Sequence, residues 1–429
     1  MTSETKGGSQ LPRMLAFLVI GLVIGGAAVY GALTPTLGQV PELNSKINQL
    51  QQQVNQLTQI TEYKIGGSMP LTGELADIGV QWKTVLEMAR DDLNSEMTKY
   101  GIKAKFTLVI NDDKTDDTEA LKSFQSLAQA GIKVVIGPAA SSQAKACKSF
   151  VDNNKIVLIT ASSTSPTLAI PNDYIFRTVG SDAIQSKALA ALVSSQGVKK
   201  VIVFHRNDEY GVAFVNFFNR EFNATGGSLI AIQYASGQAD YASEVAQLSS
   251  SAKQNGVEGI VMISFDTDGV NIVDHAKDDA FLSSLKWFSS EGVQGATGLL
   301  SDGIAQFILK TNYMGTRPVF KENPLYKDFA ARYKARAGSN APVFTANLYD
   351  AIFLAGWSIV RVGSASGEAI RSALPDVAKK YYGASGWCIF DDNGDKLYQD
   401  YSIWTVQTIN GTNQYVDIGG YSAGTITWG

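Results

Sequence analysis

The chain has 429 residues, of which 45% are hydrophobic and 18% charged, an ordinary globular mixture in a chain too long for one core. Its net charge is −4 and no block is rich in Lys or Arg, which excludes nucleic-acid binding as the function. Cys147 and Cys388 lie far apart from each other and from both histidines, so we expect no zinc site and no cofactor. The two cysteines are either buried apolar side chains or one disulfide, and their spacing does not decide between these.

An apolar segment near the N-terminus predicts a membrane anchor. Residues 14–34 contain no charged side chain, and Lys6 and Arg13 precede them. Because positive charge favours the cytoplasmic side, we expect residues 1–13 to form a cytoplasmic tail and the rest of the chain to lie outside the cell membrane. The alternative is a signal peptide that is cleaved among the small residues 27–32.

Residues 35–62 are predicted to form a Gln- and Asn-rich helical spacer. Its apolar side chains alternate at intervals of four and three residues, which is coiled-coil spacing: Leu43, Ile47, Leu50, Val54 and Leu57. A stripe this short and polar is marginal by itself. A helical spacer is therefore the favoured interpretation, and oligomerisation through the stripe is the alternative.

From Tyr63 onward, short apolar runs alternate with amphipathic stretches, which predicts βαβ units on parallel sheets. Strands are expected at 63–69, 106–110, from 134, from 156, and at 201–204, 229–234, 259–263 and 285–288. Helices are expected at 80–97, around 121–128, and at 213–222, 241–254 and 269–277; residues 323–382 are mostly helical, and strands follow through Trp404 and Tyr415. We predict an α/β protein with two Rossmann-like lobes around a hinged cleft: residues 63–181 with about 313–385, and residues 182–312 with about 386–429.

Two hydroxyl-rich turns follow successive predicted strands in the first lobe. They supply five candidate ligand-binding residues: Ser141, Ser142, Ser162, Ser163 and Thr164. The carboxyl ends of parallel strands are where open α/β folds bind ligands, and hydroxyls with free backbone N–H groups suit a carboxylate. For the first turn, N-capping of the following helix would explain the hydroxyls without any ligand.

Three loops in the second lobe offer complementary groups. Glu291 follows a predicted strand and would face the first lobe across the cleft, where a carboxylate opposite an anion site suits a zwitterion. Tyr210 and the pair Phe265 and Asp266 end two further strands. Their aromatic rings either stack on a ligand or cap the core.

The order of the motifs resembles the branched-chain amino-acid-binding (leucine/isoleucine/valine-binding) family of type I periplasmic solute-binding proteins of ABC transporters. The resemblance runs from Tyr63 to the C-terminus and rests on these motifs in order: Ile65-Gly-Gly-Ser-Met-Pro-Leu-Thr-Gly73, Asn111-Asp-Asp113, Gly137-Pro-Ala-Ala-Ser-Ser142, Thr160-Ala-Ser-Ser-Thr164, Phe176-Arg-Thr178 with Asp182, Asp208-Glu-Tyr-Gly211 and Ser290-Glu-Gly292.

The resemblance implies how a small amino acid would be bound. Ser141 or Ser142, with Ser162 and Thr164, would receive its α-carboxylate and α-amino group. From the second lobe Tyr210 and Glu291 would close over it, with Glu291 meeting the ammonium. Ile78 stands where Tyr is common in the family, and Phe265 and Asp266 lack the usual run of aromatics, so the side-chain pocket is undetermined.

The implied function is an extracytoplasmic receptor that captures an amino acid, branched-chain or otherwise, or a related amide, and delivers it to ABC permease subunits. The alternative is a surface receptor that senses the ligand without transport, although residues 1–13 are too short for a signalling domain. We expect no enzyme, because Thr160-Ala-Ser-Ser163 lacks a nucleophile elbow and no catalytic triad is evident. We expect no metal, because the acids in 112–117 lack EF-hand spacing.

Overall fold

The computed structural model describes residues 40–320 and 323–429. The predicted tail at 1–13 and the predicted anchor at 14–34 lie outside these residues, so both stay predictions. Within the described ranges no helix combines the length and apolar character that a membrane crossing needs. The chain divides into two compact units, 1–61 and 62–429.

The first unit contains the helix expected in the spacer, α2 (Val40–Thr58). Leu43 and Leu50, which belong to the predicted apolar stripe, are 59% and 51% exposed. Oligomerisation through this stripe stays a prediction.

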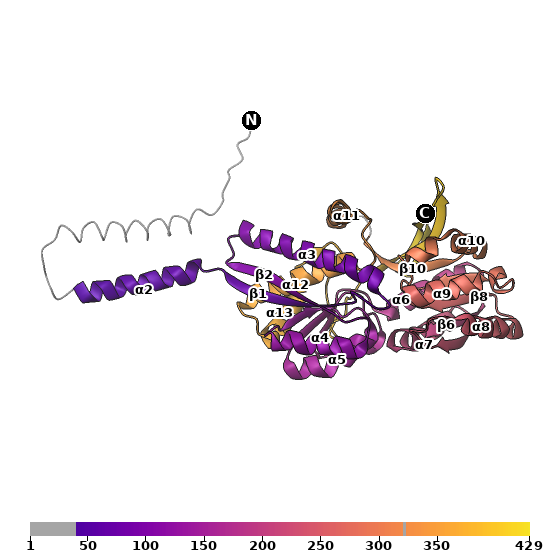
Figure 1. Ribbon diagram of the computed structural model, residues 1–429, viewed down its shortest axis with the longest axis horizontal. Coiled ribbons are helices and arrows are strands. Elements are labelled where there is room, and N and C mark those ends of the chain that lie inside the picture. The colour runs from indigo at the N-terminus through magenta and orange to yellow at the C-terminus, as the bar shows by residue number, and fades with distance from the viewer. Residues whose placement is uncertain (1–39, 321–322) are drawn as a thin grey trace, which may run out of the picture. The chain divides into compact units, whose positions relative to one another are not determined.

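The second unit contains two sheets, and we name them with their helices lobe 1 and lobe 2 (Figure 1). The sheet of lobe 1 has the order β2-β1-β3-β4-β5, and its β1–β3, β3–β4 and β4–β5 pairs are parallel. Its strands are β1 (Thr61–Met69), β2 (Ala104–Asp112), β3 (Val134–Ile136), β4 (Val157–Thr160) and β5 (Ile175–Arg177). Its helices are α3 (Ala76–Lys99), α4 (Asp117–Gln129), α5 (Ser141–Asn154), α11 (Pro324–Ala337), α12 (Thr345–Val362) and α13 (Gly367–Ala378).

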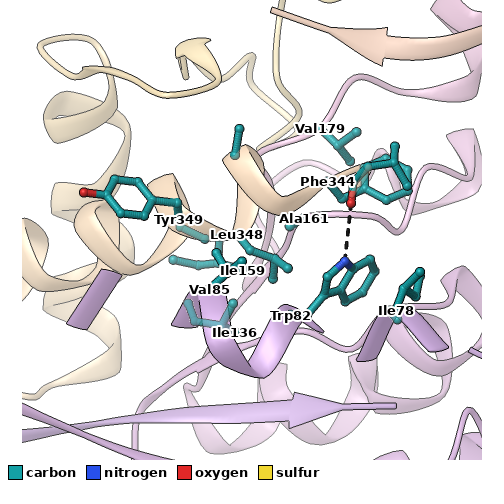
Figure 2. Packing of buried hydrophobic residues seen from close by; sticks show 14 of the residues in the cluster. Ile78, Trp82, Val85, Ile136, Ile159, Ala161, Val179, Phe344, Leu348 and Tyr349 are labelled. Atoms are coloured by element: carbon teal, nitrogen blue, oxygen red, sulfur yellow. Dashed lines mark hydrogen bonds between the residues drawn. The ribbon is translucent and has the colours of Figure 1, made fainter. Parts of the chain in front are cut away.

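The core of lobe 1 joins segments that are far apart in sequence. Helix α12 is apolar on nearly every side and packs on α3, where a Cβ at Gly356 would meet Leu93 at 2.3 Å. Figure 2 shows Trp82 of α3 beside Phe344, which precedes α12, and the Trp82 indole donates to the Val343 carbonyl at 3.3 Å. The C-terminal third of the chain therefore completes the lobe that the N-terminal third begins.

The sheet of lobe 2 has the order β15-β14-β13-β10-β9-β8-β6-β7; pairing is parallel from β10 to β7 and antiparallel from β10 through β13 to β15. Its strands are β6 (Lys200–Arg206), β7 (Ser228–Tyr234), β8 (Gly259–Ile263), β9 (Lys286–Ser289), β10 (Met314–Val319), β13 (Asp400–Ile409), β14 (Thr412–Ser422) and β15 (Thr425–Trp428). Its helices are α6 (Asp182–Ser195), α7 (Glu209–Ala224), α8 (Ala242–Asn255), α9 (Asp266–Ala276) and α10 (Asp302–Thr311). A small ribbon of β11 (Tyr382–Gly383) and β12 (Gly386–Trp387) lies outside both sheets.

The structure confirms an α/β protein with parallel-rich sheets in two lobes and differs from the prediction in detail. Strand β10 belongs to the sheet of lobe 2, although residues from about 313 were assigned to the first lobe. Its Gly315 and Pro318 are poor strand formers, but β10 pairs with β9 and β13 on its two sides. The Trp404 ring packs closely on Gly315, where a Cβ would meet it at 2.4 Å. Helices α6 and α10 were also not expected. Cys147 and Cys388 are both buried free thiols.

A buried ion pair connects β5 to the turn at 391–395. Arg177 is fully buried, and its Nε donates to Oδ1 of Asp395 at 2.5 Å. The same guanidinium donates to the carbonyls of Ser163 at 3.3 Å and Ser165 at 2.7 Å. Arg177 therefore fixes the hydroxyl-rich turn that follows β4 to a segment more than 200 residues away in sequence.

Replacing Asp395 with Ala should lower the free energy of unfolding by about 3–5 kcal/mol, because it leaves the Arg177 charge buried and unpaired. Chemical denaturation of the two proteins measures the difference. Asp392→Ala, an exposed acid in the same turn, is the matched control and should change stability little. Equal losses in the two variants would contradict a specific role for the buried pair.

Candidate ligand-binding site

A narrow pocket lies between the two lobes. Lobe 1 lines it with Leu75, Ile78, Trp82, Ala139, Ala140, Ser141, Ser162, Thr164, Val343 and Phe344. Lobe 2 lines it with Tyr210, Phe265, Asp266, Glu291, Gly292 and Gln294. The two hydroxyl-rich turns of lobe 1 and the three loops of lobe 2 therefore border the same pocket.

Most of the predicted site residues border this pocket. Eight of them line it: Ile78, Ser141, Ser162, Thr164, Tyr210, Phe265, Asp266 and Glu291. Three do not: Ser142, Ser163 and Asp182. Contact of these residues with a ligand stays a prediction.

Several of the candidate hydroxyls hold the two turns together. Ser162 and Ser163 donate to the Ala139 carbonyl at 2.9 and 3.1 Å. Ser141 accepts the Ser165 N–H at 3.1 Å from the opposite direction. Ser142 points away and bonds Asp117. Part of the hydroxyl content therefore holds the turns together. The N-capping alternative was wrong, because the N-cap of α5 is Ala140, which carries no hydroxyl.

Glu291 lies buried at the lobe 2 side of the pocket. Tyr210 donates its hydroxyl to Glu291 Oε1 at 3.2 Å, and Gln185 of α6 donates its side-chain N–H to the other oxygen. The following residue must be glycine, because a Cβ at Gly292 would meet the Ser264 carbonyl at 2.2 Å. Gln185 was missed in the sequence, because it lies in α6, a helix that was not predicted.

Asp182, the first residue of α6, lies next to Glu291 and is fully buried. Its N–H donates to the Thr164 carbonyl at 2.9 Å, but neither carboxyl oxygen has a hydrogen-bond partner. The Thr164 hydroxyl lies beside this carboxyl without completing a hydrogen bond. Asp182 thus backs the pocket from behind Thr164.

The pKa values of both Glu291 and Asp182 are raised. Burial raises the pKa of Glu291 to about 7, and burial followed by repulsion from Glu291 raises the pKa of Asp182 well above its usual range. Among the described residues no Lys or Arg lines the pocket, and nearby Arg177 is already paired with Asp395. This arrangement suits a ligand that brings an ammonium group.

Direct bonds connect the lobes at the rim of the pocket. The buried Arg206 of lobe 2 donates to Glu74 of lobe 1 at 2.8 Å, and Thr267 donates to the Glu74 carbonyl at 3.2 Å. Lys145 of lobe 1 donates to Glu209 of lobe 2 at 2.5 Å. The structure therefore shows the lobes closed on each other. None of the rim pairs could be read from the sequence, because their partners lie on different lobes.

The comparisons with known proteins agree with this geometry. The model of the receptor family ligand binding region matches residues 81–409, well over half of the chain. The chain belongs to this family, the type I periplasmic binding proteins. The resemblance inferred from the ordered motifs is thereby confirmed.

The chain is also similar to named relatives and to solved structures. The leucine-, isoleucine-, valine-, threonine- and alanine-binding protein of Pseudomonas aeruginosa is 23% identical over 348 residues, which is 80% of this chain and 89% of that protein. A leucine-binding protein of Thermotoga maritima superposes with a TM-score of 0.70 at 22% identity, covering 82% and 97% of the two chains. A solute-binding protein of an ABC transporter from Rhodopseudomonas palustris, in complex with 3,4-dihydroxybenzoic acid, superposes with a TM-score of 0.69 at 20% identity. The superposition covers 84% of this chain and 98% of that chain.

The empty protein should lose stability as the pH rises from about 4.5 through about 7, because the raised pKa of Glu291 keeps its carboxyl neutral only at lower pH. Asp182, the closest acid, shifts in the same direction, and the Tyr210 hydroxyl stays neutral. Thermal unfolding at pH 5 and pH 8 measures the change. Glu291→Gln should reduce the difference between the two pH values, and an unaltered difference would contradict this assignment.

Glu74→Ala should shift the empty protein toward an open form, because it removes the acceptor of the Arg206 bond between the lobes. Spin labels at the exposed Lys122 of lobe 1 and Lys253 of lobe 2 measure the separation of the lobes by dipolar spectroscopy. Glu368→Ala is the control, because its ion pair lies within lobe 1. A closed distance unchanged by Glu74→Ala would refute the role of this bond.

Proposed function

We propose that the protein is an extracytoplasmic solute-binding receptor that captures a small amino acid or amide-type solute between its lobes and delivers it to ABC permease subunits. It acts as a binding protein, and no bond of the solute is broken. In this proposal residues 14–34 anchor it to the cell membrane as a single pass. The observation that carries the proposal is the buried Glu291, an acid facing the pocket without a cation of the protein to neutralise it.

The opposite side of the pocket suits a carboxylate. Ser141 begins α5, a helix of 14 residues, and lines the pocket, so the positive end of the helix dipole lies at this wall. Ser162 and Thr164 line that side from the second turn. An α-amino acid carries its carboxylate and ammonium on one carbon, which matches an anion site and Glu291 across one narrow pocket.

Closure then follows from the charges. Glu291 ionises readily only when a cation accompanies it into the closed pocket, so a ligand with an ammonium stabilises the closed form. The names of the relatives support the same ligand class, since the Pseudomonas aeruginosa protein is a leucine-, isoleucine-, valine-, threonine- and alanine-binding protein. The Rhodopseudomonas palustris structure, with an aromatic acid, is the reason to test other solutes alongside amino acids.

Calorimetry of the detergent-solubilised full chain against amino acids, short amides, urea, polyamines and benzoates should identify an amino acid or amide ligand. Glu291→Gln and Thr164→Ala should each weaken its binding by at least about ten-fold, because one partner of a desolvated contact is lost. Thr98→Ala is the matched control, since this exposed hydroxyl bonds a carbonyl of its own helix, and it should leave affinity unchanged. The proposal fails if no amino acid or amide binds, or if the two pocket variants bind like the control.

A further inference from the structure

A second uncompensated acid lines the pocket. Asp266 is the first residue of α9 and is 6% exposed, and its Oδ2 is buried without a hydrogen-bond partner. Burial raises the pKa of this carboxyl to about 8. A buried acid without a partner destabilises a protein, so its presence at a pocket wall requires an explanation.

Among the residues that the structure describes, the charged groups acting on Asp266 are acids. Asp77 of lobe 1 and Asp268 of α9 repel it and raise its pKa further. Asp268 forms an ion pair with Arg206. The same guanidinium also pairs with Glu74 and Asp208, so it already serves three acids. The described residues therefore leave Oδ2 of Asp266 without a hydrogen-bond partner at the pocket wall.

Asp266 and Glu291 belong to different parts of the same pocket. Glu291 bonds Tyr210 and Gln185 and repels Asp182, whereas Asp266 interacts with Asp77 across the cleft. Apolar side chains line the space as well: Ile78, Trp82, Phe265 and Phe344. Figure 2 shows Ile78 and Phe344 beside Trp82 in the apolar cluster of lobe 1. The pocket thus offers two separate acidic points and an apolar surface.

We propose that Asp266 accepts a hydrogen bond from an N–H or O–H group at the end of the ligand's side chain, so that the protein selects polar or basic α-amino acids over aliphatic ones. This inference rests on the proposed function, because the ligand's side chain reaches Asp266 only when its α-ammonium is bound to Glu291. The apolar wall receives the stem of the side chain. An aliphatic ligand would leave Asp266 buried and unpaired.

Calorimetry with pairs of amino acids of similar size tests the inference on the detergent-solubilised full chain. The pairs are lysine with norleucine, glutamine with methionine, and threonine with valine. In at least one pair the donor-bearing member should bind about ten-fold tighter or more, the scale of one satisfied buried contact. Asp266→Leu should abolish or reverse that preference, whereas Asp274→Leu, an exposed acid on the same helix, should preserve it.

The outcomes separate the inference from the proposed function. If amino acids bind and Glu291→Gln weakens them, but the aliphatic member is preferred in every pair or Asp266→Leu leaves the preference unchanged, the inference is overturned and the proposed function stands. If no amino acid binds, or Glu291→Gln binds like the wild type, the proposed function and the inference both fail. Thermal unfolding checks folding: Asp266→Leu should melt no lower than the wild type, because it removes a buried unpaired acid.

Discussion

The burial of Glu291 beside Asp182 is the constraint on which the site depends. Two carboxyls in a water-poor space cannot both ionise without a neighbouring positive charge, and the closest arginine is already paired with Asp395. Closing the lobes removes the water that would otherwise solvate these acids. The free energy of closure therefore depends on what fills the pocket, which is the property that a capture device needs.

A rigid frame keeps the opposite wall in place. The turns after β3 and β4 are cross-linked by Ser162, Ser163 and the Ser165 N–H, and Arg177 fixes the second turn through two of its carbonyls. The hydroxyls of Ser162 and Ser163 therefore form hydrogen bonds within this frame. What remains directed at the pocket is a small set of groups whose geometry cannot relax independently, as preorganised binding requires.

The sequence predicted the sheets and much of the pocket because both follow from local patterns. Buried parallel strands appear as continuous apolar runs, and their carboxyl ends are where ligands bind. It could not separate Ser141 from Ser142, since adjacent residues of a helix start point about 100° apart and the register is decided by packing. Gln185, Glu74 and Arg206 were not predicted, because the partners of these residues come from remote segments of the chain. Strand β10 was not predicted because Gly315 and Pro318 are poor strand formers, and its pairing with the remote strand β13 is not visible in local sequence.

The raised pKa of Glu291 has a consequence for the surroundings in which the protein works. Near neutral pH the Glu291 carboxyl of the empty pocket is partly protonated, and the pKa of the neighbouring Asp182 is raised as well. If the protein captures an ammonium-bearing ligand as proposed, the ammonium replaces the proton on Glu291, and capture releases acid. Protons and ligand then compete for the same carboxyl, so acidification would weaken binding without altering any contact to the ligand.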